Sequence, residues 1–568
     1  MVADQVRRPR LSDALRRRLR SLAIEVWPVV VVAFAGLIAL GHIADSPWKD
    51  LFLYNGDSIA LPLIEQSIQN GEPFRWVFSS QNFLFPEGPL YVLSTIFTDS
   101  ARVALLTNAV LNLVSLYVLL RTIAHLLAHR SRHRMVEITI ALGSTFLFVV
   151  FVLLEPTDAV NRSAIATLFL LTTYYYGVIL SGLGLVALVL WVSRSFGPLH
   201  WGRKRSIIFA TSTTALVGLT TFSDPLFVFQ VIAPFVAVIV VLIFCNRLSW
   251  TGAGVLVGPI FVGAILAMYF RHLLASSFAS EVSSYLAISK IPDSLNVLWD
   301  TLKELLSSGP GTLKLLLLCL LFLVTAAIFV FALYAQSRPR LAKRVVTADL
   351  FITAFVIASA ISLLLGEVFT GSTTTRYLEP LFVFPLLTSV AVGVYVLRRM
   401  LAEVKRADLR RNLSRFVSGI AVVASLLIVV TGGLNIPAVA SMARGDGYTT
   451  ARCFDRFIGS SRANGVGTFW SVRQLDLYGT QRGALLQVRE PIVVFGWISN
   501  IAPYEHKKFS YVIQDDSGQI TPDAIESLGE PSKVVKCPSY TIYDYRGTPG
   551  EQILTDRIAA SLVPFLRK

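Results

Sequence analysis

The hydrophobic positions of this chain fall into long apolar runs separated by short polar segments. A helix needs about 20 apolar residues to cross the hydrocarbon core of a bilayer, and about eleven runs reach that length. They lie near residues 26 to 43, 103 to 122, 136 to 154, 171 to 192, 206 to 222, 226 to 245, 252 to 271, 312 to 334, 348 to 366, 380 to 398 and 416 to 433. The pattern predicts an all-α polytopic membrane domain over residues 26–433.

The polar segments between the runs alternate between basic and acidic. Residues 1–25 are basic, and a basic segment follows every even-numbered run. These segments contain Arg130, Arg132 and Arg134; Arg203, Lys204 and Arg205; Arg247; Arg338, Arg340, Lys343 and Arg344; and Arg398, Arg399, Lys405, Arg406, Arg410 and Arg411. Because short cytoplasmic loops carry excess Lys and Arg, we expect a cytoplasmic N-terminus in the plasma (inner) membrane. An odd number of spans then places the C-terminus outside.

The chain becomes polar after the last apolar run. Residues 434–568 mix short alternating stretches, such as Phe509 to Ile513, with Gly, Pro, Asn and Asp. This pattern predicts a mixed α/β exoplasmic (periplasmic) domain. Cys453 and Cys537 both lie in it, and an oxidising compartment favours a disulfide between them.

Composition supports the membrane class. Of 568 residues, 54% are hydrophobic and only 15% are charged, and the mean hydropathy is +0.62. The net charge of +15 is distributed over the short loops, so no separate basic domain exists to bind nucleic acid. The sequence also lacks the Gly-rich nucleotide-binding motifs and His or Cys pairs at metal-ligand spacing.

Candidate chemistry gathers in the predicted outer segments, the longest of which span residues 44–102 and 273–311. Asp57 precedes an amphipathic stretch, where it is either a helix cap or a catalytic carboxylate. Glu87 lies in Phe-Pro-Glu-Gly-Pro and is either a turn residue or a second functional acid. Asp224 follows a predicted span, and the preferred interpretation is that it caps a helix or anchors the chain at the membrane interface. Several ionisable groups on one membrane face suggest a water-filled cavity there.

Two segments carry a resemblance to a known family. The early Asp57, the amphipathic stretch and the return over Asn82–Tyr91 (NFLFPEGPLY), together with Thr375–Pro380 (TRYLEP), resemble the polytopic glycosyltransferases of the GT-C superfamily. The resemblance implies transfer of a sugar from a polyprenyl-phosphate donor to a cell-envelope glycan, lipid or protein acceptor at the outer membrane face. It assigns catalytic roles to Asp57 and, as a second acid, Glu87, and it places Arg376 at the lipid phosphate.

The sequence does not decide whether the protein needs a metal cofactor. Many GT-C members carry two adjacent acids in the first outer loop, whereas here Ser58 follows Asp57 and the next acid, Glu65, lies about two helical turns further on. The resemblance therefore leaves undecided whether Asp57 holds a divalent cation such as Mg²⁺ or Mn²⁺.

The proposed reaction explains the choice of residue types. Attack of an acceptor hydroxyl on the anomeric carbon needs a base, for which Asp57 is the candidate, and a cation on the leaving phosphate. A guanidinium is permanently charged and forked, which suits a phosphate. The further candidates for binding substrate are Arg376, Arg162, Arg102, Asp224, Tyr377 and Trp76.

Two other functions remain alternatives. One is a transporter for lipid-linked sugars, which is disfavoured because the apolar runs are almost free of the charges that ion relays place near the midplane. The other is a non-catalytic assembly or receptor protein with a GT-C-like fold, whose outer acids only cap helices.

Overall fold

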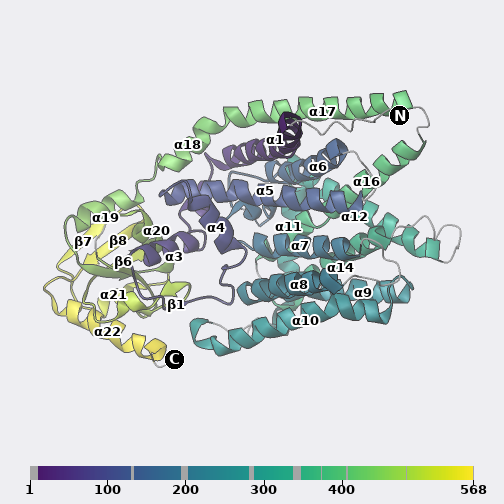
Figure 1. The fold of residues 1–568 in the computed structure, drawn as a ribbon. Helices are drawn as coiled ribbons and strands as arrows, with labels where there is room; N and C mark the ends of the chain where they lie inside the picture. The colour runs from purple at the N-terminus through teal and green to yellow at the C-terminus, as the bar shows by residue number, and fades with distance from the viewer. Residues whose placement is uncertain are drawn as a thin grey trace.

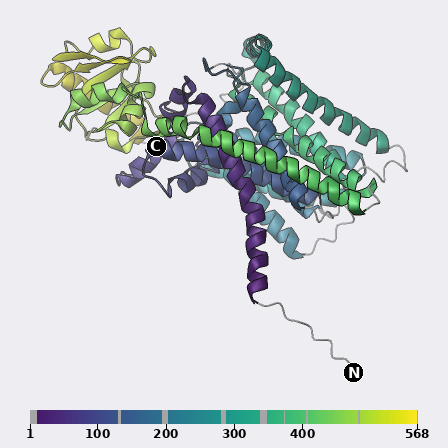
Figure 2. The same ribbon diagram turned by 90° about the horizontal axis from the view of Figure 1, so that it is seen from above.

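The computed structural model describes residues 11–128, 134–160, 162–193, 203–279, 287–336, 347–371, 374–403, 407–480 and 483–566. A bundle of long helices occupies one part of the molecule, and an α/β domain lies at one end of it (Figures 1 and 2). Some residues of the predicted basic segments lie outside the described residues, namely 1–10, Arg130, Arg132, Arg338, Arg340, Lys343, Arg344, Lys405 and Arg406.

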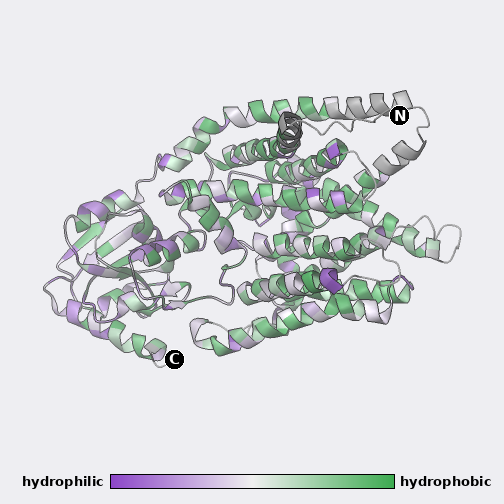
Figure 3. Ribbon diagram, viewed as in Figure 1, coloured by the Kyte–Doolittle hydropathy of each residue, from purple (hydrophilic) through white to green (hydrophobic). Residues whose placement is uncertain are grey.

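Each of the eleven predicted runs contains a helix, but not every one of these helices is long enough to cross a membrane. The helices are α1 (Leu11–Ile43), α5 (Ala101–Leu127), α6 (Arg134–Leu153), α7 (Tyr176–Val192), α8 (Arg203–Ser223), α9 (Ala233–Phe244), α10 (Trp250–Leu273), α12 (Gly309–Gln336), α14 (Thr347–Phe369), α16 (Leu386–Glu403) and α17 (Ala407–Leu434). Within the described residues, eight helical stretches are long and apolar enough to cross a membrane, and a ninth results if α17 and the bent continuation α18 (Ile436–Arg444) form one span. Tyr176–Val192 and Val228–Phe244 are shorter apolar helices. Apolar residues dominate the bundle, whereas the other domain is more polar (Figure 3), so the predicted fold class is confirmed.

The start of one predicted span is wrong. The run from residue 171 does not begin as a helix, because α7 starts at Tyr176 after Tyr175 takes a left-handed conformation with φ 70°. Before it lies the 3₁₀ turn η1 (Ala166–Leu170), whose backbone N–H groups at Ala166 and Thr167 donate to the Glu155 carboxylate at 2.6 and 2.7 Å. Buried polar anchors of this kind permit irregular backbone where it is enclosed by protein. Residues 171–175 connect η1 to α7 without forming a regular helix.

The connections at the end of the bundle facing the α/β domain have structure of their own. The first connection contains α2 (Trp48–Leu53), α3 (Ala60–Gln69), β1 (Trp76–Val77) and α4 (Glu87–Thr95). Later connections contain η3 (Ala275–Ser277), η5 (Ile288–Lys290) and α11 (Ile291–Leu306). The π-helical turn η2 (Val228–Ile232) continues directly into α9, and η6 (Thr375–Leu378) and α15 (Pro380–Val383) form the start of the apolar stretch Thr375–Val396. The first connection is referred to below as the first outer loop.

The C-terminal domain is built around a six-stranded mixed sheet in the order β4-β3-β2-β6-β8-β7. The strands are β2 (Asn464–Gly467), β3 (Leu485–Arg489), β4 (Val493–Val494), β6 (Phe509–Asp515), β7 (Lys533–Lys536) and β8 (Tyr540–Asp544). Strand β2 is parallel to β3 and β6, and the other pairs are antiparallel. Helices α19 (Thr450–Ile458) and α20 (Phe469–Tyr478) contribute to one apolar core, and α21 (Pro522–Glu526) and α22 (Pro549–Leu566) contribute to the other.

Alternation along strand β6 explains why the sheet has two apolar faces. Tyr511 and Ile513 belong to the core with α19 and α20, whereas Val512 belongs to the core with α21 and α22. Successive side chains of a strand point to opposite faces, so one apolar strand supplies both cores. The remaining strand of the domain, β5 (Ser499–Asn500), leaves this sheet and pairs antiparallel with β1 of the first outer loop, with Trp76 opposite Asn500; the 3₁₀ turn η7 (Ala502–Tyr504) follows it.

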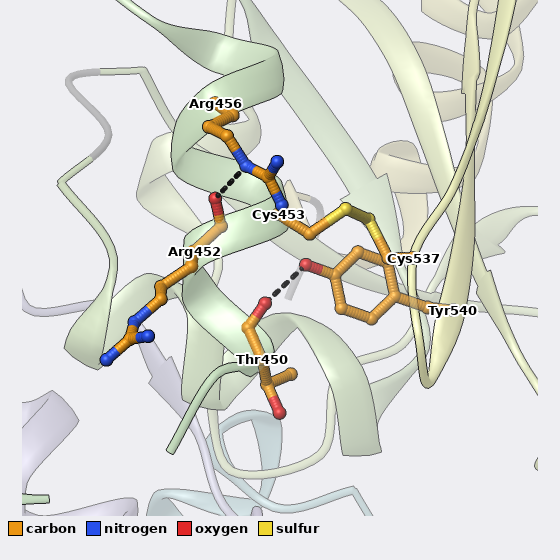
Figure 4. Close-up of a disulfide and its surroundings, with 6 residues drawn as sticks. All are labelled: Thr450, Arg452, Cys453, Arg456, Cys537 and Tyr540. Carbon is orange, nitrogen blue, oxygen red and sulfur yellow. Dashed lines mark hydrogen bonds between the residues drawn. A yellow bond between two sulfur atoms is a disulfide. The ribbon is translucent and has the colours of Figure 1, made fainter. Parts of the chain in front are cut away.

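The predicted disulfide between Cys453 and Cys537 is confirmed. It links helix α19 to the turn between β7 and β8, with a Cα–Cα distance of 5.9 Å (Figure 4). Beside it, the Tyr540 hydroxyl donates to the carbonyl of Thr450 at 2.7 Å. Both contacts fasten α19 to the edge of the sheet.

Candidate functional site

Asp57 lies in the first outer loop, and its backbone is fixed from three directions. Its N–H donates to Asn55 Oδ1 at 3.0 Å, and its carbonyl accepts from the Thr173 hydroxyl at 2.7 Å. The carbonyl of the preceding Gly56 accepts from Arg473 Nε at 3.0 Å. The loop, the irregular segment before α7 and the C-terminal domain therefore hold Asp57 together.

The side chain of Asp57 does not cap the following helix. The N-cap residue of α3 is Ile59, and no side-chain hydrogen bond is made at that cap. The capping interpretation is therefore wrong, since the chain makes a further turn between Asp57 and the first residue of α3. The carboxylate instead stays partly open, with 20% of its side chain exposed.

Arg376 is the cation that the fold places beside this carboxylate. Its Nη1 atom lies 3.9 Å from Asp57 Oδ2. The guanidinium lies 5.7 Å from the ring centre of Tyr175 and 5.4 Å from that of Tyr377, and these two rings meet edge to face. Aromatic faces attract a guanidinium, so the fork is held in place while 33% of the side chain remains exposed.

Arg473 is a site residue that sequence analysis missed. It extends from α20 of the C-terminal domain, and only 4% of it is exposed. Besides Gly56, it donates through Nη1 to Gln487 Oε1 at 3.3 Å and to the carbonyl of Ile498. In the sequence it is one of many arginines of a polar domain, so no local signal distinguishes it.

Two opposing effects set the protonation of Asp57. Burial raises the pKa of its carboxyl group above the usual value, and the positive charges of Arg376 and Arg473 act to lower it. The net pKa shift is upward. Burial lowers the pKa of Arg473 to about 10, so this guanidinium is still charged at neutral pH.

Glu87 and Asp224 form a second, more deeply buried acidic pair. Each is 1% exposed. Burial, with a smaller contribution from Asp224, raises the pKa of Glu87 to about 8, and burial raises the pKa of Asp224 to about 7. Asp224 Oδ1 accepts from the N–H of Leu226 at 2.9 Å, as expected for a turn anchor. In the described part of the chain, no hydrogen bond or ion pair links Glu87 to Asp57 or Arg376.

The helix facing Glu87 is adapted to this carboxyl group. A Cβ atom added at Gly177 of α7 would lie 2.2 Å from Glu87 Oε1, so any side chain there would displace the Glu87 carboxyl group. Glu87 is enclosed by the bundle, and its role as a second functional acid stays a prediction.

The remaining predicted site residues occupy different surroundings. Arg162 is exposed, and its carbonyl accepts from the Thr375 hydroxyl at 2.5 Å, next to Arg376. Arg102 lies 4.1 Å from the ring centre of Tyr478 and donates to the Tyr54 hydroxyl at 3.3 Å. Arg102 thus joins the first outer loop to the C-terminal domain, apart from Asp57.

Trp76 is 6% exposed and lies on β1. It lines a pocket between the first outer loop and the C-terminal domain whose lining does not include Asp57 or Arg376.

A divalent cation fits poorly at Asp57. One carboxylate flanked by two guanidinium groups is an unfavourable donor set for a hard cation, which prefers several oxygens. Among the described residues, no group of three or more His, Cys, Asp or Glu side chains is arranged to hold a metal ion. The divalent cation stays an untested prediction, and no step is derived through it.

Comparison with known proteins gives distant likenesses only. No family model matches the chain, and no curated protein matches its sequence. Among solved structures, ArnT from Cupriavidus metallidurans in the apo state is similar at 12% identity and a TM-score of 0.46, over 92% of this chain and 98% of that one. The apo Archaeoglobus fulgidus oligosaccharyltransferase is similar at 14% identity and a TM-score of 0.39, over 86% and 69%. The complex of the same protein with Zn and sulfate is similar at 12% identity and a TM-score of 0.38, over 91% of this chain and 73% of that one. Such low values leave the function to be inferred from the site.

Proposed function

We propose that this protein is a membrane glycosyltransferase that transfers a sugar from a polyprenyl-phosphate donor to a cell-envelope glycan, lipid or protein acceptor, with Asp57 as the general base. The observation that supports it is the approach of Asp57 and Arg376 to 3.9 Å. These two residues lie far apart in the sequence of the membrane domain. From the sequence, Asp57 is assigned to the acceptor hydroxyl and Arg376 to the leaving phosphate, which are two parts of one reaction.

The chemistry of the pair suits glycosyl transfer. Asp57 takes the proton of the acceptor hydroxyl, whose oxygen forms a bond to the anomeric carbon of the donor sugar. The bond from that carbon to the phosphate oxygen breaks, and polyprenyl phosphate leaves with the electron pair. Arg376 stabilises the negative charge that develops on the phosphate, because a guanidinium donates two parallel hydrogen bonds to it.

Both groups are prepared for these roles before substrate binds. A raised pKa brings a carboxylate closer to the working pH, which favours general-base catalysis. Arg376 is held between Tyr175 and Tyr377, so little side-chain freedom is lost when it binds a phosphate. The backbone carbonyl of Arg162 accepts a hydrogen bond from Thr375, the neighbour of Arg376, which keeps Arg162 as a further candidate for binding the donor phosphate.

The proposal is tested by transfer assays on purified protein in lipid nanodiscs. A panel of polyprenyl-phosphate sugars is incubated with extracted cell-envelope acceptors, and transfer is followed with a radiolabelled sugar. We expect at least one donor to be consumed by the wild-type protein and spared by Asp57→Asn. Absence of transfer from every donor, with protein shown to be folded, contradicts the proposed function.

A further inference from the structure

A pocket of about 480 Å³ lies between the first outer loop and the C-terminal domain. Helix α3 and strand β1 form one wall, and α20, β3 and β5 form the other; α3 and α20 pack against each other (Figure 1). The polar side chains used in the argument below are Gln66, Glu72, Trp76, Arg473, Asp476 and Asn500. Asn70 and Lys507, which also line the pocket, are exposed, so its margin faces solvent.

The walls of this pocket carry hydrogen-bonding capacity that the protein does not use. Gln66 Oε1, Trp76 Nε1 and Arg473 Nη2 are buried atoms without a hydrogen-bond partner among the described residues. Leaving such a group unsatisfied costs about 1–3 kcal/mol, and native structures rarely keep several together without a reason. One acceptor and two donors belong to residues that line one pocket, which points to a ligand that offers both kinds of group.

The other polar side chains of the pocket are already ordered. Asn500 Nδ2 donates to Ser67 Oγ at 2.9 Å and to Glu72 Oε2 at 3.1 Å, and Ser67 Oγ donates to Glu72 Oε2 at 2.8 Å. The Gln66 amide donates to the carbonyl of Asp476 at 3.2 Å. A pre-arranged set of polar groups reduces the entropy that a ligand loses on binding.

The charges of the lining residues indicate a neutral ligand. Two carboxylates, Glu72 and Asp476, are balanced by two cations, Arg473 and Lys507. Ordinary small-molecule sites are mostly apolar with a few polar groups, whereas half of the residues that line this pocket are polar or charged. An indole beside amide, carboxylate and guanidinium groups suits a molecule with many hydroxyl groups and some apolar C–H surface.

We propose that this pocket binds neutral sugar residues of the acceptor glycan, next to the reacting hydroxyl. The inference rests on the proposed function and narrows its acceptor to a carbohydrate chain. The link is Arg473, which lines the pocket and also donates to the carbonyl of Gly56, the residue before Asp57. The Arg473 side chain thereby connects the wall of the pocket to the backbone that carries Asp57.

A direct measurement of sugar binding tests this proposal independently of sugar transfer. Wild-type protein in nanodiscs is titrated with manno-, gluco-, galacto- and arabino-trisaccharides, and binding is followed by saturation-transfer difference NMR. We expect at least one trisaccharide to bind and Trp76→Phe to weaken its binding about fivefold, the effect of losing one hydrogen bond. Trp470→Phe is the matched control, because Trp470 is on α20 but outside the pocket lining; it stays within twofold of wild type.

Two results overturn the proposal. One is that no trisaccharide binds the folded wild-type protein, and the other is that Trp76→Phe and Trp470→Phe bind the trisaccharide equally well. The variant Asp57→Asn distinguishes failure of the glycan-binding proposal from failure of the proposed transferase function. We expect that variant to bind the trisaccharide normally while sugar transfer is lost, so binding reports on the pocket and transfer reports on the base.

Discussion

Replacing Asp57 by asparagine is the sharpest test of the proposed mechanism. The substitution keeps the size of the side chain and removes its capacity to accept a proton. Since the Asp57 side chain makes no cap for α3, little stability depends on it. Its ion pair with Arg376 is 3.9 Å long and partly exposed, and such pairs contribute about 0–1 kcal/mol. We therefore expect Asp57→Asn to fold normally.

The expected loss of activity is much larger than this structural effect. Removing a general base lowers the rate about a hundredfold to ten-thousandfold, which corresponds to roughly 3–5 kcal/mol in the barrier. Initial rates of transfer from a radiolabelled polyprenyl-phosphate sugar, measured on matched amounts of folded protein, give the ratio directly. Asp99→Asn is the control, because Asp99 is an exposed carboxylate near the end of the same loop.

The pH dependence gives a second measurement of the same role. The base is active when deprotonated, so the wild-type rate is lost as pH falls through the pKa of Asp57, which is raised above 3.8. The residual activity of Asp57→Asn lacks this acidic limb. Transfer by Asp57→Asn within about twofold of wild type refutes the assignment of Asp57 as base.

Three further predictions concern the leaving group, the disulfide and the buried acids. Arg376→Lys keeps the charge but loses the fork, so donor kcat/KM falls about tenfold to a hundredfold; an unchanged value contradicts a bidentate phosphate contact. Cys453→Ser lowers the unfolding free energy of the C-terminal domain by about 4.5 kcal/mol for a closure of 84 residues. If the lost disulfide is the cause, the double variant Cys453→Ser/Cys537→Ser is no less stable than Cys453→Ser, which denaturant titration measures. The raised pKa of Glu87 makes the folded state lose stability between pH 4.5 and about 8, by at most about 5 kcal/mol. Glu87→Gln should have the same melting temperature as wild type at pH 5 and a higher one at pH 8.5. If the melting temperatures of the two proteins change equally between these pH values, the effect is disproved.

The parts of the fold that follow from one-dimensional pattern were predictable. Apolar runs must become helices in a bilayer, because lipid offers no partner for the backbone, and the disulfide followed from two cysteines in one polar domain. The irregular start of α7 was not predictable, because Tyr174 and Tyr175 continue an apolar run and the anchoring carboxylate, Glu155, precedes it in a loop. Hydropathy reports where a segment is buried and is insensitive to such anchors.

The candidate site shows the same limit. Asp57 and Arg376 were separately identifiable, since each residue type suits one half of a reaction. Arg473 was not, because its role comes from burial against Gly56 and from no motif of its own. Gly56 itself is required there, since a Cβ atom would lie 2.6 Å from the Phe469 ring. Contacts between residues so distant in sequence are determined by packing, which a single sequence does not display.

The junction of the first outer loop with the C-terminal domain makes that domain part of the site. Strand β5 pairs with β1, the Tyr478 hydroxyl donates to the carbonyl of Leu53 at 2.7 Å, and the Tyr54 ring stacks on Tyr448 at 4.0 Å. Arg102 packs against these rings, 4.1 Å from that of Tyr478. Because these contacts flank Asp57 on both sides in the sequence, the position of its carboxylate depends on the docked domain. The membrane domain supplies Asp57, the proposed base, and Arg376, and the C-terminal domain fixes the loop on which Asp57 is carried.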